Sequence, residues 1–195
     1  MFLLSCGGDL EKNTTNNTDT AEIQDMTDDV EEQPEEWSET VMDLTPDGYV
    51  LFKTYKGDLN RDEYEDMVVV FNRVDPDDEM LNRGVMLVTT DADGKMTIEA
   101  FNKEGAYCGE CGGVMGNPLA DVVIKNGYFT IEHFGGSREK WTDDPTFKYN
   151  EEDGKWYLHR HSKQVHDGLD PENGSSSTML TTKDFGKVAF EDFRY

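Results

Sequence analysis

From about residue 49 onward, the chain consists of short runs of β-branched and aromatic residues joined by turns that contain glycine. Asn126-Gly127 stands between the apolar runs 121–125 and 128–133. An Asn-Gly pair in this position is the strongest short-range signal for a β-hairpin. Two further pairs of runs are separated by 91–94 and 151–154, which both end in glycine, the residue that adopts the positive φ of tight turns at least cost. The pattern therefore predicts antiparallel strands that are adjacent along the chain.

The runs define the strands that we expect. They lie at 49–55, 67–71, 85–90, 95–100, 121–125, 128–133, 146–149, 155–159, 178–181 and 186–190. Residues 72–84 and 162–177 are typical of loops, and no segment shows the 3.6-residue apolar period of an amphipathic helix. The sequence therefore predicts an all-β domain, an antiparallel meander of roughly eight to ten strands. Such a meander can close as a sandwich, a barrel or a propeller-like stack.

Acidic residues outnumber basic ones, with 42 Asp and Glu against 18 Lys and Arg, so the formal net charge is −24. A surface of this sign repels the phosphate backbone of nucleic acids, and we expect no nucleic-acid partner. No apolar run approaches the roughly 18 residues that a membrane-spanning helix needs. Nucleic-acid binding and helical membrane spans are therefore excluded as function classes.

The acidic excess is concentrated in residues 9–40, which contain twelve acidic residues and a single basic one. Ile23, Met26 and Val30 are too few apolar side chains to offset the entropy of ordering this segment. We therefore expect residues 9–40 to form a disordered acidic linker and residues 41–195 to form a single β domain.

The first eight residues form a short apolar run that ends in Ser5, Cys6 and two glycines. They resemble the end of a bacterial lipoprotein signal peptide, in which the cysteine is lipidated after cleavage. The resemblance implies a lipid on Cys6 and a membrane anchor in the bacterial cell envelope. We expect the outer membrane, with the protein facing either the periplasm or the cell surface. The alternative is an unstructured apolar terminus with a free thiol.

An acidic loop precedes the valine-rich run at 67–70. Its oxygen donors are the side chains of Asp58, Asn60, Asp62 and Asp66 and the backbone carbonyl of Tyr64. Alternating acids on a curled loop offer the oxygen ligands that Ca²⁺ prefers. The loop resembles the Asp-x-Asn-x-Asp-Gly-x-x-Asp loops of FG-GAP-type repeats, with Glu63 in place of their glycine. The resemblance implies a structural Ca²⁺ site, and the alternative is a solvated turn closed by its own Asx hydrogen bonds.

Cys108 and Cys111 form a Cys-x-x-Cys motif. In an exported protein, this spacing favours a disulfide that closes a small loop. A second option is Zn²⁺, with further ligands from His133, His159, His161 or His166. A third is redox catalysis, although the glycine-rich sequence after Cys111 is a poor helix former and an active thiolate normally lies at a helix N-terminus.

His159-Arg160-His161 offers another arrangement of imidazoles. Side chains two residues apart lie on the same face of a regular strand, where a pair of histidines can hold a metal. The simpler interpretation is a pair of exposed histidines.

Five segments together carry a resemblance to a known group of proteins: Lys56 to Asn60, Cys108 to Gly113, Ile124 to Phe129, His133 to Ser137 and Trp156 to Leu158. They resemble a group of uncharacterised bacterial exported proteins and lipoproteins with one FG-GAP-like acidic loop and a CxxCGG motif. The resemblance covers about residues 49–193. It implies export and a β architecture, and it implies no particular activity.

The leading hypothesis is a non-enzymatic lipoprotein whose β domain binds a protein or glycan partner. One alternative is an envelope enzyme, either a thiol oxidoreductase that uses Cys108 and Cys111 or a zinc hydrolase that uses the histidines. Another is an acidic immunity or inhibitor-type protein that binds a basic partner.

Overall fold

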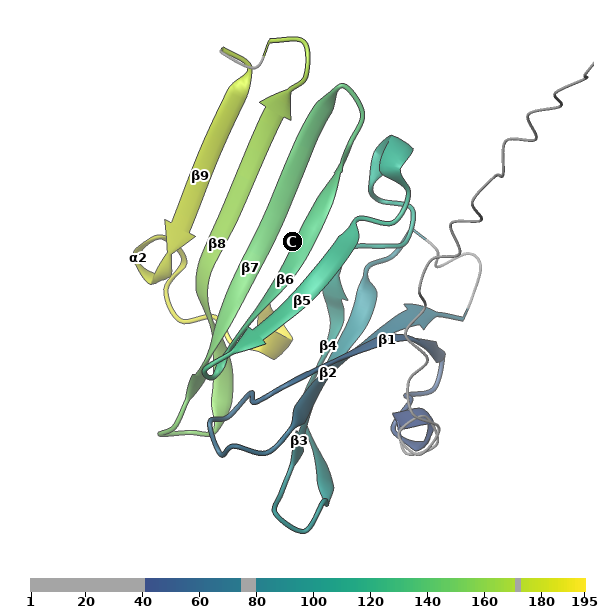
Figure 1. Ribbon diagram of the computed structural model, residues 1–195, viewed down its shortest axis with the longest axis vertical. Helices are drawn as coiled ribbons and strands as arrows, with labels where there is room; N and C mark the ends of the chain where they lie inside the picture. Colours follow the sequence, from purple (N-terminus) through teal and green to yellow (C-terminus); the bar gives the residue numbers. More distant parts are fainter. Residues whose placement is uncertain (1–40, 75–79, 171–172) are drawn as a thin grey trace, which may run out of the picture. The chain divides into compact units, whose positions relative to one another are not determined.

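The chain folds into nine described β-strands in two antiparallel sheets, as Figure 1 shows. This computed structural model describes residues 41–74, 80–170 and 173–195. The predictions for Cys6 and for the linker 9–40 lie outside the described residues. Within them, the prediction of an all-β antiparallel meander is confirmed, because each strand pairs with its sequence neighbour inside its sheet. The two sheets form a sandwich-like pair of layers, and neither closes into a barrel.

The first sheet contains β1 (Tyr49–Gly57), β2 (Asp66–Arg73), β3 (Arg83–Thr90) and β4 (Met96–Ala106), in that order. Its central strands β2 and β3 are buried at almost every position, because they carry apolar residues at odd and even positions alike. In β2, Val68 and Val70 face the core between the sheets, whereas Val69 and Phe71 face a second apolar cluster on the opposite side. The first sheet therefore has two buried faces.

The second apolar cluster is small and covers only the outer face of the first sheet. It contains Val41, Met67, Val69, Phe71, Met86 and Val88, with Leu44, Tyr49, Leu51, Met96 and Phe101 packed against them. The rings of Tyr49, Phe71 and Phe101 meet edge to face, with centroids 5.4 to 6.4 Å apart. Val41 comes from a short helical stretch at 41–43.

The second sheet contains β5 (Leu119–Lys125), β6 (Tyr128–Gly136), β7 (Glu139–Asn150), β8 (Lys155–Asp167) and β9 (Ser175–Thr181). The predicted Asn126-Gly127 turn joins β5 to β6, with φ of +54° and +73° at its two residues. Apolar and polar residues alternate along the strands of this sheet, so one face packs on the core and the other is exposed.

Two sequence predictions about this sheet are wrong. Residues 162–177 are not a loop, because β8 continues to Asp167 and β9 begins at Ser175. This half of β8 lacks alternating apolar residues because its side chains make polar contacts, such as the ion pairs of Lys163 with Asp143 and of Asp167 with Arg138. The strand predicted at 186–190 is reduced to one bridge between Tyr157 and Ala189, since β9 already pairs with β8 from Arg160 onward.

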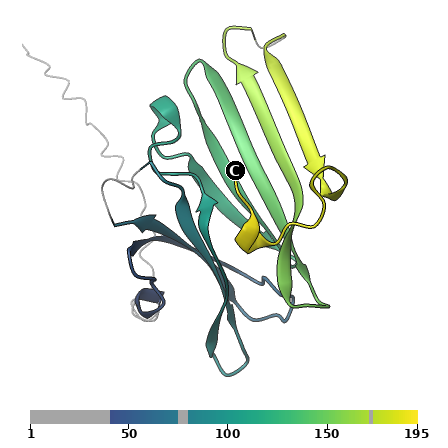
Figure 2. The ribbon, with the colours of Figure 1, turned by 180° about the vertical axis from the view of Figure 1, so that it is seen from behind.

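The C-terminal segment packs on the inner face of the second sheet, where it lies in front of the strands in Figure 2. After α2 (Thr182–Phe185), the chain crosses to η3 (Phe190–Asp192). There Phe190 packs against the stacked rings of Phe129 and Phe147, whose centroids are 4.9 Å apart. The buried amide of Asn102 on β4 donates to the carbonyls of Phe190 and Phe193 at 2.6 and 3.0 Å. These bonds tie the C-terminal segment to the first sheet as well.

Candidate functional site

The acidic loop between β1 and β2 brings three predicted ligands together. Carboxylate oxygens of Asp58, Asp62 and Asp66 all lie within 4.8 Å of one another. Asn60 belongs to the same group, because its amide donates to an Asp62 oxygen at 2.8 Å and its carbonyl accepts from the Asp62 N–H. Tyr64 lies on the exposed part of the loop, and its N–H donates to Asp62 Oδ1 at 2.9 Å. The donor set is hard and anionic, which suits Ca²⁺ or Mg²⁺ better than a transition metal.

Asp66 anchors this loop to the body of the domain. Its side chain is fully buried and accepts from the N–H groups of Leu59, at 2.8 Å, and Thr90, at 2.9 Å. Burial raises the pKa of Asp66; the two N–H bonds act against this rise, and the charges of Asp62 and Asp58 add to it. A bound cation would remove the electrostatic cost of holding these carboxylates together.

The loop follows a left-handed backbone at Glu63, with φ of +71°, and also at Arg61, with φ of +72°. Glu63 occupies the position at which the FG-GAP-type motif has glycine, so the chain takes up a positive φ there in spite of the substitution. Positive φ is unfavourable for a residue with a Cβ atom. The curl is held by the Asp58 carboxylate, which accepts from the N–H groups of both residues.

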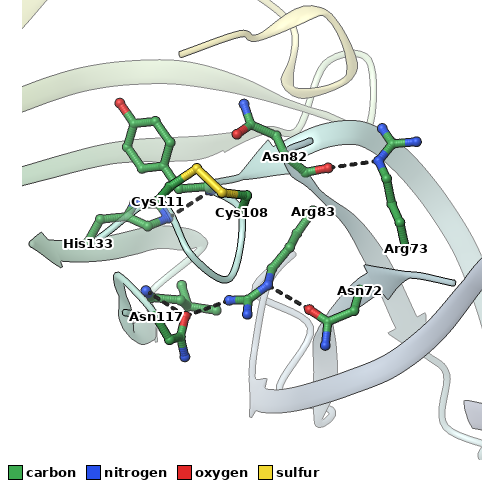
Figure 3. Close-up of a disulfide and its surroundings, with 10 residues drawn as sticks. Asn72, Arg73, Asn82, Arg83, Cys108, Cys111, Asn117 and His133 are labelled. Atoms are coloured by element: carbon green, nitrogen blue, oxygen red, sulfur yellow. Dashed lines mark hydrogen bonds between the residues drawn. A yellow bond between two sulfur atoms is a disulfide. The ribbon is translucent and has the colours of Figure 1, made fainter. Parts of the chain in front are cut away.

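Cys108 and Cys111 form a disulfide, with their Cα atoms 5.2 Å apart. They lie in the connection that crosses from β4 to β5, which Figure 3 shows in close-up. Cys108 is fully buried. The helix that follows, η2 (Gly113–Met115), has only three residues and therefore supplies no useful dipole to a thiolate. The arrangement fits the disulfide interpretation.

The crossover that contains the disulfide is bonded to both sheets. From the first sheet, the buried Arg83 donates to Asn72 at 2.7 Å and to Asn117 of the crossover at 2.8 Å (Figure 3). From the second sheet, Gly136 N–H donates to Gly112 O at 2.9 Å. The disulfide thus stiffens a segment that clamps the two layers together, which is a structural role.

The pair of histidines predicted on one face of a strand is not formed. His159 and His161 lie on opposite faces of the second sheet, because a bulge at His159 breaks the regular alternation of β8. The ring of His159 is exposed and meets Tyr128, whereas His161 is buried against Phe193. His166 is exposed and bonds to Ser175. The prediction that His159 and His161 share one face is therefore wrong.

Sequence reasoning missed a buried polar cluster at the far end of the inner face of the second sheet. Asp143 on β7 lies at its centre and is only 5% exposed. It bonds to His161 Nε2, to Lys163 Nζ at 2.8 Å and to the hydroxyl of Tyr107 at 2.9 Å. Burial raises the pKa of Asp143, but the bonds from His161 and Lys163 outweigh this effect and lower it below its ordinary value.

His133 belongs to the same cluster and is held in one neutral form. Its Nε2 accepts from the Tyr107 N–H at 3.3 Å, so the proton is on Nδ1, which donates to the Asp143 carbonyl at 3.0 Å. Burial lowers the pKa of His133 to about 4. The ring of Tyr195 covers both histidines, with centroids 5.1 Å from His133 and 6.4 Å from His161. The sequence did contain a signal for His133, since it continues the inward-facing series Phe129 and Ile131.

A second feature that sequence reasoning missed is a pair of adjoining cavities on the outer face of the second sheet. One has a volume of about 450 Å³ and is lined by residues that include Lys148, Tyr157 and Lys187. The other has a volume of about 270 Å³ and is lined by residues that include Lys125, Tyr128 and Arg160. His159 lines both cavities. They combine segments that are far apart in sequence, so no local motif could have identified them.

Comparison with known proteins adds nothing to these geometric observations, because no family model, curated protein or solved structure matches the chain. Among the described residues, no helix has the length and apolar character needed to cross a bilayer.

Proposed function

We propose that the protein is a non-enzymatic lipoprotein of the bacterial cell envelope, anchored through Cys6, whose β domain is a rigid binding domain. The disulfide geometry of Cys108 and Cys111 carries this proposal. Disulfides persist in oxidising compartments such as the periplasm and the cell surface, and they are rare in the cytosol. A stiff crossover between two packed sheets is also what a binding domain needs to present a preformed surface.

The contacts of the polar groups favour binding over catalysis. Cys108 is buried, and so are His133, Asp143 and His161, which are engaged with one another or with backbone groups. A general base or a metal ligand must reach its substrate within hydrogen-bond distance or through one water. His133 and His161 lie instead beneath the ring of Tyr195.

The anchor is tested by expressing the chain from its own locus in the native host and analysing Cys6 by mass spectrometry. We expect a lipid-modified Cys6 in the membrane fraction and release of a Cys6→Ser variant into the soluble fraction. The Cys108→Ser/Cys111→Ser double variant is the matched control and should stay in the membrane fraction. An unmodified Met1 on a cytosolic protein with reduced Cys108 and Cys111 would refute the proposal.

We further propose that the acidic loop binds Ca²⁺ and that the ion is structural. The approach of Asp58, Asp62 and Asp66 to within 4.8 Å supports this, as does the buried Asp66 that connects the loop to β3. The backbone carbonyl of Leu59, inside the same loop, accepts from Trp156 Nε1 of the second sheet at 3.1 Å. Ordering the loop with an ion would therefore also support the contact between the sheets.

Thermal unfolding of the chain in EDTA and in excess Ca²⁺ tests this site. At a free concentration of about 100 times Kd, Ca²⁺ stabilises the folded state by about 2.7 kcal/mol. For a domain of this size, that corresponds to a rise in Tm of roughly 5–10 °C. Asp62→Asn should abolish the rise, whereas Asp93→Asn, in the exposed turn between β3 and β4, should leave it intact. Identical melting curves with Ca²⁺ and EDTA would show that the loop is a solvated turn.

A further inference from the structure

The two cavities on the outer face of the second sheet differ in charge from the rest of the molecule. The chain contains 42 acidic and only 18 basic residues. None of the described residues that line either cavity is Asp or Glu, while the linings include Lys125, Lys148, Arg160 and Lys187. Twelve of these acids lie in residues 9–40, but within residues 41–195 acidic residues still outnumber basic ones by 30 to 17, so linings with four cations and no carboxylate make the cavities a local positive region.

Three of the four cations are available to a ligand. Among the described residues, no carboxylate forms an ion pair with Lys125, Lys148 or Arg160. Arg160 donates through Nε to the Thr146 hydroxyl at 3.2 Å, which holds its guanidinium over the smaller cavity. Lys187 is already paired with Asp153 at 3.2 Å.

Aromatic rings lie beside these cations. Lys148 Nζ is 5.5 Å from the centroid of the Tyr128 ring, and Lys187 Nζ is 4.0 Å from that of Tyr157. The His159 ring stands edge-on to Tyr128, with centroids 5.3 Å apart. Because His159 lines both cavities, the two adjoin at this residue, and together they combine flat rings with side chains that donate hydrogen bonds. We call this surface the outer groove.

The environment of His159 is consistent with a positive local potential. Partial burial lowers the pKa of His159, and the positive charges of Lys148 and Arg160 lower it further. Nearby cations thus dominate over the distant acidic residues at this point. An anion in the outer groove would offset both charges and raise the pKa of His159.

We propose that the outer groove binds an acidic oligosaccharide, a short chain of sugar rings that carry carboxylates. The larger cavity, about 450 Å³, lies in the usual range of small-molecule sites, about 300–1,000 Å³. Two adjoining cavities with separate cations match a ligand whose charges are spaced by uncharged rings. The tyrosine rings offer flat apolar surface to a sugar face, and the adjoining Asn150 and Thr182 offer partners for hydroxyl groups.

A densely charged polyanion fits less well. The net charge of −24 repels at long range any ligand that carries a charge at every unit, such as a nucleic acid. A neutral sugar, in turn, would leave Lys125, Lys148 and Arg160 without a counter-charge. The proposal rests on the proposed function only in treating the β domain as a binding domain, and it does not depend on the lipid anchor or on Ca²⁺.

The test titrates the full chain with a trisaccharide of galacturonic acid and with its neutral methyl ester, using calorimetry and the NMR signal of His159. We expect saturable binding of the acid with a Kd of about 1 mM or tighter. Binding of the neutral ester should be at least tenfold weaker, and the pKa of His159 should rise only with the acid. Arg160→Glu and Lys148→Glu should each weaken binding of the acid at least tenfold. Lys95→Glu, an exposed lysine at the far hairpin of the first sheet, is the matched control and should bind normally.

Four outcomes would overturn the proposal. They are no saturation by the acid, equal binding of the ester, unchanged binding by both groove variants when these fold normally, and binding of inorganic phosphate or oligothymidylate at least as tight as that of the trisaccharide. Circular dichroism establishes whether the variants fold. Failure here would leave the envelope proposal intact, because that proposal is decided by the modification of Cys6.

Discussion

The two sheets differ in how many of their faces are buried. The first sheet is covered on both sides, by the core between the sheets and by the second apolar cluster around Phe71 and Phe101. Within the described part of the chain, the second sheet is covered on its inner side only, and its outer face carries Lys125, Lys148 and Arg160 in open cavities. The two layers thus differ in how much of their outer faces is buried.

The inner faces also differ along their length. Where the second sheet lies against the first, its inner face is apolar, with Phe129, Phe147 and Leu158 in the core. Further along, the inward series continues with His133, Asp143 and His161, and the C-terminal segment covers it. A sheet that extends beyond its partner can therefore bury a polar cluster whose groups are all hydrogen-bonded in place of apolar contacts. The stability of the folded state then depends on the protonation of these groups.

The strongest test of the comparison removes one large side chain from the outer face of the first sheet. Phe71 is fully buried there, so Phe71→Ala should lower the free energy of unfolding by about 3–5 kcal/mol. On the outer face of the second sheet, Val123 is 43% exposed, and Val123→Ala should change it by no more than about 0.5 kcal/mol. Urea denaturation measures both. Equal effects would mean that the two outer faces are not covered differently.

The next test concerns the polar end of the second sheet. Because the pKa of His133 is about 4 in the folded state and 6.5 as a free side chain, its neutral form contributes stability above pH 6.5. That contribution is lost as the pH falls from 6.5 to 4, and it amounts to about 3 kcal/mol. Asp66, Asp144 and Glu132 have raised pKa values, mainly through burial, and act in the opposite direction.

The contribution of His133 is isolated by comparison with a variant. The free energy of unfolding of wild type and of His133→Gln is measured by denaturation between pH 7 and 4, and the difference between them should shrink towards low pH. His166→Gln, at an exposed histidine, is the control and should run parallel to wild type. A difference between wild type and His133→Gln that does not depend on pH would mean that His133 is not held neutral.

The hairpins were predictable because their signal is local. Asn126-Gly127 carries its own backbone preference, and the strands on either side alternate in the register that the turn requires. The acidic loop was predictable for the same reason, since Asp58, Asp62 and Asp66 lie within nine residues. The positive φ at Glu63 was not predicted, because a residue with a Cβ atom argues against it.

The polar cluster and the outer groove could not be predicted, because they depend on pairing between distant segments. Tyr107 and Asp143 are 36 residues apart, and in a chain with 42 acids nothing marks Asp143 as the buried one. The faces of His159 and His161 depend on a bulge that leaves no trace in the sequence. The sequence also did not distinguish a sandwich from a barrel or a propeller-like stack. The alternation of residues predicts which face of a strand is buried, but it does not predict which segment covers that face.

A smaller effect on stability is expected when glycine replaces a glutamate in the acidic loop of the first sheet or in a turn of the second sheet. Glu63→Gly should raise the free energy of unfolding by about 0.5–1 kcal/mol, because relief of the positive φ outweighs the added freedom of the unfolded chain. Glu152→Gly, in the turn between β7 and β8, has no positive φ to relieve and should lower it. Equilibrium denaturation of the two variants gives the comparison. Destabilisation by both would mean that Glu63 is not strained.

The smallest expected effect concerns the surface contact between the layers. Arg61 and Glu151 join the acidic loop to the turn between β7 and β8 at 2.9 Å, but their side chains are 51% and 70% exposed. Exposed pairs contribute about 0.2–1 kcal/mol, and removing an acid from a chain of net charge −24 also relieves repulsion. Glu151→Gln should therefore change the free energy of unfolding by less than about 0.5 kcal/mol, with no difference from wild type at high salt. A loss above about 1 kcal/mol would mean that the layers are held by this ion pair, and not by the buried contact of Trp156 with Leu59 and the apolar core around it.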